Sequence, residues 1–140
     1  MRAAFTLIEL LIVVVILAIL AAVTVPLFLD ATGDSKMGAG VTNLWTLRSQ
    51  IQVYKAQHQG RPPDAALSNL LKKTDINGNA GSDFGPYLYA LPLNPFTNKS
   101  TVRPAAANPP TSATPGTDRG WLYHAASGNV WLDDANYLDR

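Results

Sequence analysis

Cysteine is absent from this chain of 140 residues. The fold therefore holds no disulfide, and thiol redox chemistry is excluded. A small domain without disulfides must gain its stability from packing, from a bound metal or from neighbouring subunits. Histidine is scarce, since only His58 and His124 are present, and we expect both to be structural. No serine-nucleophile elbow, phosphate-binding loop or metal-binding histidine pair occurs, so we predict that the chain is not an enzyme.

An excess of charge of either sign is also lacking. Lys and Arg together number 11 and Asp and Glu 10, which gives a formal net charge of +1. A nucleic-acid-binding domain usually carries a basic patch. We therefore expect no nucleic-acid partner.

Polar residues are nearly missing from residues 5–29, which read FTLIELLIVVVILAILAAVTVPLFL. A helix of this length spans about 37 Å, enough to cross a hydrocarbon core of roughly 30 Å. We therefore predict that the segment lies in a lipid bilayer. A cleaved secretory signal and a plain membrane anchor are the alternatives. A secretory signal, however, places charge before its apolar region and not a carboxylate inside it.

Glu9 is that carboxylate, and no Lys, Arg or His occurs in residues 10–29 to pair with it. A charge inside a membrane costs about 2.5–3.5 kcal/mol on insertion scales. If a peptidase cut between Ala4 and Phe5, the new amine of Phe5 could pair with Glu9 of an adjacent, axially shifted subunit. Such a pair would fix the register of the two helices. The alternative is a carboxylate near the membrane interface with no role.

The segment FTLIELLIVVVILAILAAVTVP resembles the N-terminal segment of type IV pilins and type II secretion pseudopilins. In that family a prepilin peptidase removes a short leader and N-methylates the new N-terminal phenylalanine. The resemblance implies cleavage between Ala4 and Phe5, methylation of Phe5, and roles in filament assembly for Phe5, Glu9 and Pro26. Pro26 matches the proline near which the helix can loosen in the filament, because proline removes an intrahelical hydrogen bond. Ala4 stands where the family's leader usually ends in glycine.

The same resemblance implies the partners and the location of the chain. The partners would be further copies of the chain, a prepilin peptidase, minor pilins or pseudopilins, an inner-membrane assembly platform with its ATPase, and the lipid bilayer before assembly. The chain would sit in the bacterial inner membrane first, and in a periplasmic pseudopilus or an extracellular pilus afterwards.

The helical pattern continues beyond the apolar segment, and we predict a helix from Phe5 to His58. Apolar positions there recur at spacings of three and four residues, which places them on one stripe that should pack on the following domain: Leu44, Leu47, Ile51, Tyr54 and His58. Gly60 and Pro62-Pro63 should end the helix.

Shorter elements follow. Residues 64–73 predict a second helix with an apolar face of Leu67, Leu70 and Leu71. Residues 86–95 hold apolar side chains that we expect to be buried, but they are too rich in proline for a central strand. Residues 97–120 predict a long loop without regular structure. Residues 121–124 and 129–133 predict two strands joined by a hairpin loop.

The predicted fold class is α+β, with a long N-terminal helix packed on a small C-terminal domain with antiparallel strands, as in pilins. We divide the chain into a leader (residues 1–4), a transmembrane and assembly helix (5–29), the amphipathic second half of that helix (30–59) and a globular head (60–140) that includes the proline-rich loop 97–120.

A second resemblance bears on the kind of filament. The stretches Gly60-Arg-Pro-Pro63, Gly85-Pro-Tyr-Leu88 and Leu91-Pro-Leu-Asn-Pro-Phe96 are similar to turns of major pseudopilins. Many type IV pilins close a C-terminal loop with a disulfide, which this chain lacks. We therefore predict a major pseudopilin-like subunit of a type II secretion system. The alternatives are a major or minor pilin of a surface pilus (adhesion, motility, DNA uptake) and a monomeric membrane-tethered binding domain.

Calcium is a possible ligand by the same resemblance, because pseudopilins bind it near their C-terminal hairpin. Asp118, Asp133, Asp134 and Asp139 are candidates there, but no spacing selects among them, so we predict no metal ligand. The stretch Asp75-x-Asn77-x-Asn79 matches a calcium loop only in part, since Ala80 stands where the loop needs glycine. We interpret it as a solvated turn.

Overall fold

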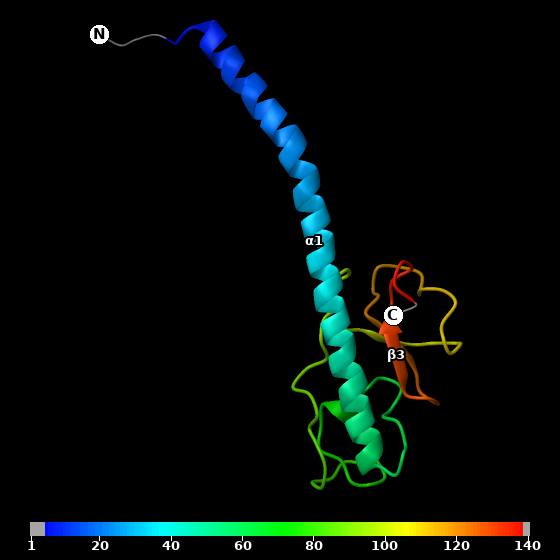
Figure 1. The fold of residues 1–140 in the computed structure, drawn as a ribbon. Helices are drawn as coiled ribbons and strands as arrows, with labels where there is room; N and C mark the ends of the chain where they lie inside the picture. The colour runs from blue at the N-terminus through cyan, green and yellow to red at the C-terminus, as the bar shows by residue number, and fades with distance from the viewer. Residues whose placement is uncertain (1–4, 139–140) are drawn as a thin grey trace. The chain divides into compact units, whose positions relative to one another are not determined.

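The computed structural model describes residues 5–138, except for the side chains of residues 27–30. The chain divides after Lys36 into two units, of which the second runs from Met37. The elements are α1 (Leu7–Gln57), the short 3-10 helix η1 (Ser68–Leu70), and the strands β1 (Val102–Pro104), β2 (Trp121–His124) and β3 (Asn129–Leu132) (Figure 1). The predicted α+β class is confirmed.

The long helix is continuous over 51 residues, close to the predicted range. It ends where the glycine and prolines were expected to stop it. Gly60 adopts a φ of +81° and donates its N–H to the carbonyl of Lys55 at 2.7 Å, which satisfies one of the last carbonyls of the helix. Pro62 and Pro63 then prevent the helix from continuing.

The core of the second unit forms where the sequence predicts it. All five predicted stripe residues are buried: four lie in α1, from Leu44 to Tyr54, and His58 directly follows the end of the helix. They pack against the sheet and η1 through a cluster of buried side chains: Leu67, Leu70, Trp121, Tyr123, Val130 and Leu132. Burial of this apolar surface is the main force that holds the unit together.

His58 lies fully buried in this core. Its Nδ1 lies 2.8 Å from the carbonyl oxygen of Tyr54, to which it can only donate, and its Nε2 lies 3.0 Å from the hydroxyl oxygen of Thr74. Its ring also stacks on the ring of Tyr54, with centroids 3.7 Å apart. Both ring nitrogens are therefore occupied inside the fold, as a structural histidine requires.

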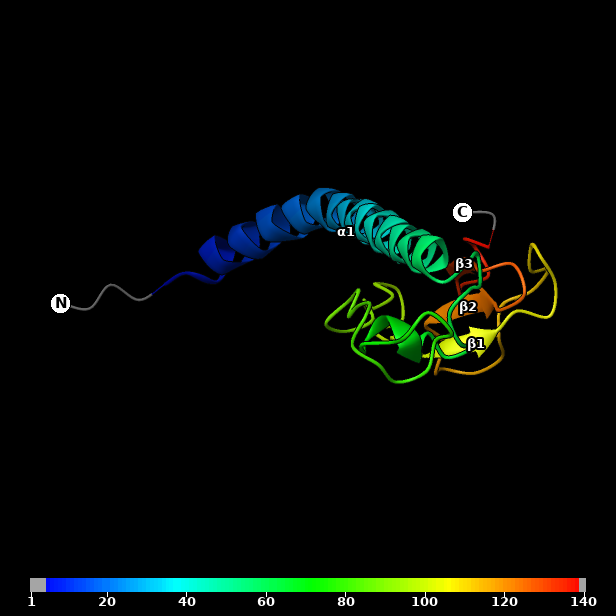
Figure 2. The same cartoon turned by 90° about the horizontal axis from the view of Figure 1, so that it is seen from below.

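The sheet is mixed, with strand order β1-β2-β3 (Figure 2). The antiparallel hairpin of β2 and β3 is confirmed, and Gly128 supplies the positive φ of +79° that its turn needs. The prediction that residues 97–120 lack regular structure is wrong in one place. There, β1 pairs in parallel with β2, and Val102 lies opposite Trp121. A strand of three residues ending in Pro104 is too short to show a periodic pattern, and proline is tolerated because the strand lies at the sheet edge.

The predicted second helix over residues 64–73 is also wrong, because only η1 forms there. Both oxygens of the Asp64 carboxylate accept hydrogen bonds from the next turn, from the N–H of Asn69 at 2.7 Å and from the hydroxyl of Ser68 at 2.9 Å. These local bonds compete with helix formation. Leu67, with a φ of +56°, and Leu70 are buried as expected, whereas Leu71 is exposed.

The segment 86–95 forms no strand, as predicted, and follows the flank of α1. Tyr87, Leu88 and Leu91 pack against the core in half-buried positions. The expectation of burial fails for Tyr89 and Leu93, whose side chains are exposed. In a segment without regular structure, no periodicity tells inward from outward positions.

Replacing Gly120 by alanine should destabilise the second unit by about 1–3 kcal/mol, the usual cost of overpacking a core. A Cβ at this buried position would lie 2.6 Å from the backbone nitrogen of Thr101. Gly38→Ala is the matched control, because nothing lies within 4 Å of a Cβ there and alanine favours a helix by about 1 kcal/mol. Urea denaturation of the detergent-solubilised chain, followed by tryptophan fluorescence, compares them. Equal midpoints for Gly120→Ala and the wild type would contradict the packing described here.

Candidate functional site

The N-terminus of α1 is closed by Thr6 and Glu9. One oxygen of the Glu9 carboxylate, Oε2, accepts hydrogen bonds from both the N–H and the hydroxyl of Thr6, each at 2.8 Å. The N–H of Glu9 in turn donates to the Thr6 hydroxyl oxygen at 3.3 Å. This reciprocal arrangement is a capping box, which satisfies backbone groups that the first helical turn leaves free.

Thr6 is thus a residue of the site that the sequence interpretation missed. From the sequence we sought a partner for Glu9 among Lys, Arg and His only, whereas Thr6 supplies two hydrogen bonds. The signal was present as Thr6-x-x-Glu9 directly before an apolar run, which is the sequence pattern of a capping box. These bonds do not neutralise the charge. Within residues 5–138, no cationic group lies at ion-pairing distance from Glu9.

The other predicted site residues lie along the same unit. Phe5 is exposed and precedes the helix, and Glu9 follows four residues later. Ala4, and with it the proposed cleavage point, lies outside the described residues. Pro26 lies within α1, where its missing N–H leaves the carbonyl four residues before it without the usual helical donor.

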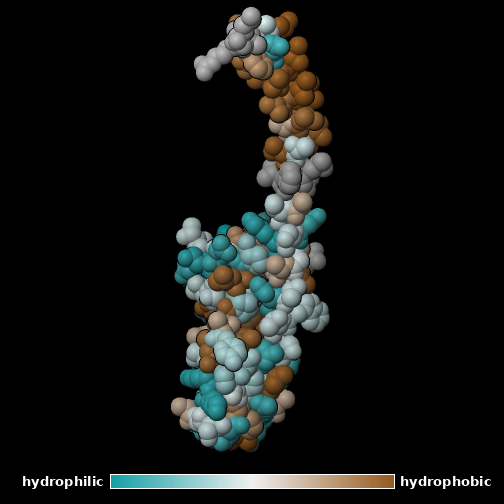
Figure 3. Space-filling model, turned by 90° about the vertical axis from the view of Figure 1, so that its left-hand side faces the viewer, coloured by the Kyte–Doolittle hydropathy of each residue, from teal (hydrophilic) through white to brown (hydrophobic). Residues whose placement is uncertain are grey.

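An apolar surface surrounds this site. The large apolar side chains between Phe5 and Val25 are 49% to 84% exposed, and they form the brown region of Figure 3. The helix is long and apolar enough to cross a bilayer, and the apolar part of it is not buried within the chain. A continuous apolar surface of this kind marks contact with lipid or with other protein.

The carboxylates considered for calcium have partners within the fold. The Asp75 carboxylate accepts the backbone N–H groups of Asn77 and Asn79 at 2.9 Å, and the bond from Asn79 is the main reason that the pKa of Asp75 lies below its usual value. Asp118 Oδ2 lies 3.6 Å from Arg103 Nη2, which makes an ion pair. Oδ1 of the buried Asp133 accepts the N–H of Thr114 at 2.7 Å, whereas its buried Oδ2 has no hydrogen-bond partner among the described residues.

Asp139 lies outside the described residues. Among the described residues, no three His, Asp or Glu side chains come together in a group that could hold a metal ion. We derive no function through calcium.

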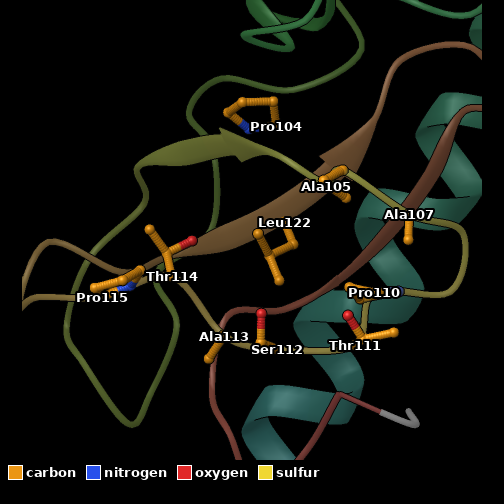
Figure 4. Close-up of a pocket in the computed structure, with 11 residues that line it drawn as sticks. Pro104, Ala105, Ala107, Pro110, Thr111, Ser112, Ala113, Thr114, Pro115 and Leu122 are labelled. Atoms are coloured by element: carbon orange, nitrogen blue, oxygen red, sulfur yellow. The ribbon is translucent and has the colours of Figure 1, made fainter.

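A pocket of about 180 Å³ opens between the proline-rich loop and the first two strands (Figure 4). The side chains that line it are those of alanine, proline, serine, threonine and Leu122. None of these lining residues is ionisable, so the pocket offers no acid, base or metal ligand. It does not suggest a catalytic centre.

Comparisons with known proteins identify a matching family motif and two relatives. Residues 1–25 match the family model of the prokaryotic N-terminal methylation motif. Type II secretion system core protein G of Pseudomonas aeruginosa is 31% identical over 99 residues, which cover 69% of this chain and 70% of that protein. The protein of the same name from Vibrio cholerae is 33% identical over 95 residues, covering 67% of this chain and 65% of that protein. No solved structure matches the chain significantly.

The chain combines a long apolar helix, an acidic residue in the first turn of that helix and a small α+β unit. The matching motif and the two relatives agree with these features. The chain belongs to the type IV pilin and type II secretion pseudopilin family.

Proposed function

We propose that the chain is a filament subunit that polymerises through its N-terminal helix, and that the filament is the pseudopilus of a type II secretion system. The observation that carries this proposal is the exposed apolar helix with a carboxylate that has no cationic partner among the residues that the structure describes. Both features are costly for a molecule that stays alone. A second copy of the helix relieves both.

The proposed pairing begins with the leader. Cleavage between Ala4 and Phe5 creates an amine at Phe5, and N-methylation retains its positive charge. This amine pairs with Glu9 of the adjacent subunit. In a medium of low dielectric the attraction is strong, and a shifted register would leave the two charges buried apart. Pairing therefore selects one axial offset between neighbouring helices.

The capping box leaves room for this partner. Both hydrogen bonds from Thr6 go to Oε2 of Glu9, while Oε1 accepts no hydrogen bond among the described residues. Oε1 is thus the oxygen that receives the amine of the neighbour. Thr6 acts as a positioning residue, because it fixes the orientation of the carboxylate at the helix end.

The remaining assignments follow from this role. The head, residues 60–140, would lie outside the membrane, and residues 5–29 would pass from the inner membrane into the filament. The partners would be a prepilin peptidase, other pseudopilins, and the assembly platform with its ATPase. The names of the relatives favour type II secretion over a surface pilus. Pro26 would let the helix loosen in the filament.

Mass spectrometry of the mature protein tests the first step. The expected N-terminal peptide begins with methylated Phe5, because only a free terminus there supplies the cation. A chain that retains residues 1–4 after filament assembly would remove that cation and contradict the proposed mechanism.

A further inference from the structure

The outward face of α1 in the second unit carries no charge. Between Met37 and Gln57 the charged residues are Arg48 and Lys55. Both turn towards the hairpin, where Arg48 Nη2 donates to the carbonyl of Val130 and Lys55 Nζ to that of Ser127, each at 3.1 Å. The exposed positions of this stretch are neutral: Gly38, Ala39, Thr42, Trp45, Thr46, Ser49, Gln52, Val53, Ala56 and Gln57. A helix that faces water normally places charged residues there.

A hollow of about 210 Å³ lies beside the largest of these side chains. Val41, Leu44, Trp45 and Arg48 line it, and the Trp45 side chain is 65% exposed. The few residues that contribute most of the binding energy of protein interfaces are enriched in tryptophan, tyrosine and arginine, and they lie in pockets. Trp45 and Arg48 beside this hollow fit that description.

Tyr89 is the other large aromatic side chain that is exposed in this unit. It lies fully exposed on the segment 87–93, whose two ends are fixed to the helix. The Tyr87 hydroxyl donates to Gln57 Oε1 at 2.6 Å, and Asn43 Nδ2 donates to the carbonyl of Leu93 at 2.9 Å. Tyr89 is thus an aromatic projection on an anchored segment.

The projection and the hollow lie on opposite flanks of the helix. Gln57, which holds the segment of Tyr89, follows Arg48, which lines the hollow, by nine residues. At 3.6 residues per turn this separation is two and a half turns, so the two residues point in opposite directions. In Figure 1 the yellow-green segment lies on one side of this part of α1, and β3, to which Arg48 donates through the carbonyl of Val130, lies on the other.

A projection and a hollow on opposite flanks form a contact that does not close on itself. Copies placed side by side in one orientation can each offer Tyr89 to the hollow of the next, and the contact repeats without limit. We infer that Tyr89 of one subunit inserts beside Trp45 of its neighbour, where the Arg48 guanidinium lies within reach of its ring. This inference rests on the proposed function, because it requires copies aligned in a filament.

Cross-linking of the full chain in cells tests this contact, since the wild type has no cysteine that could interfere. Val41→Cys marks the hollow and Ala90→Cys marks the projection, while Trp45 and Tyr89 stay in place. The double variant, treated with a short bismaleimide, should yield a ladder of dimers, trimers and larger species. Adding Tyr89→Ala should reduce the ladder at least tenfold. Adding Ile76→Ala, which removes an exposed apolar side chain from another turn, should leave it unchanged.

Three results would overturn the inference. One is a dimer formed by Val41→Cys alone, because that requires a symmetric contact. Another is a product whose mass includes a different protein. The last is the absence of a ladder in cells whose filaments are visible by electron microscopy. In that last case the proposed function stands and only this contact fails, whereas absence of filaments from wild-type cells that carry the secretion machinery would refute the proposed function itself.

Discussion

Glu9→Ala should lower the amount of assembled filament by about a hundredfold or more, while the chain still enters the membrane. Removing one partner of a buried ion pair costs about 3–5 kcal/mol, because the other charge is left without compensation. Insertion of the single chain should not suffer, since a charge inside the bilayer is itself unfavourable by about 2.5–3.5 kcal/mol. Sheared filaments and membrane fractions, quantified by immunoblotting, measure the two effects separately.

Thr6→Ala is the comparison variant for this experiment. It removes the hydroxyl that caps the helix and holds Oε2 of Glu9, a loss of about 1 kcal/mol, but it retains the charge. Filament yield should therefore fall less than with Glu9→Ala. Normal filaments from Glu9→Ala would show that pairing of this carboxylate does not drive assembly.

Trp121→Ala should produce the largest loss of stability in the second unit, about 3–5 kcal/mol. The Trp121 side chain is fully buried in the core cluster, and its indole Nε1 donates to the carbonyl of Pro92 at 2.8 Å. The substitution leaves a cavity and an unpaired carbonyl. Because domains of this size are stable by only about 5–15 kcal/mol, much of the unit's stability would be lost. A denaturant titration of the detergent-solubilised chain, followed by circular dichroism, measures this change in the free energy of unfolding.

Trp45→Ala provides the matched control, since it deletes the same side chain from an exposed position of the same unit. Its effect on the free energy of unfolding should stay within about 0.5 kcal/mol. If both substitutions destabilised the unit equally, the assignment of Trp121 to the core and Trp45 to the surface would be wrong.

The parts of the fold that follow a regular period were predictable. The stripe from Leu44 to His58 has helical spacing, and all five residues are buried. The hairpin was marked by two apolar runs around Gly128. Elements held by single side-chain contacts were not predictable. Hydrogen bonds to the Asp64 carboxylate stabilise a turn where a helix was predicted. The short strand β1 is defined by its pairing with β2, in which Val102 lies opposite Trp121.

Glu9 and Thr6, the two residues of the capping box, differ in how easily the sequence reveals them. Glu9 is conspicuous in the sequence because one carboxylate stands in an apolar segment. Its capping partner Thr6 is an ordinary polar residue, and its role appears once the helix is seen to begin at Leu7. The ion pair with Phe5 remains a prediction, since it joins two molecules.

The parallel pairing of β1 with β2 explains why the proline-rich loop is long. After Pro104 the chain has to return along the whole length of the sheet before β2 can run in the same direction, and parallel neighbours need a connection of about a dozen residues or more. Residues 105–120 provide this return path. A deletion that turned them into a tight turn would detach the outer strand from the sheet, so the length of this stretch is constrained even where its sequence has no pattern.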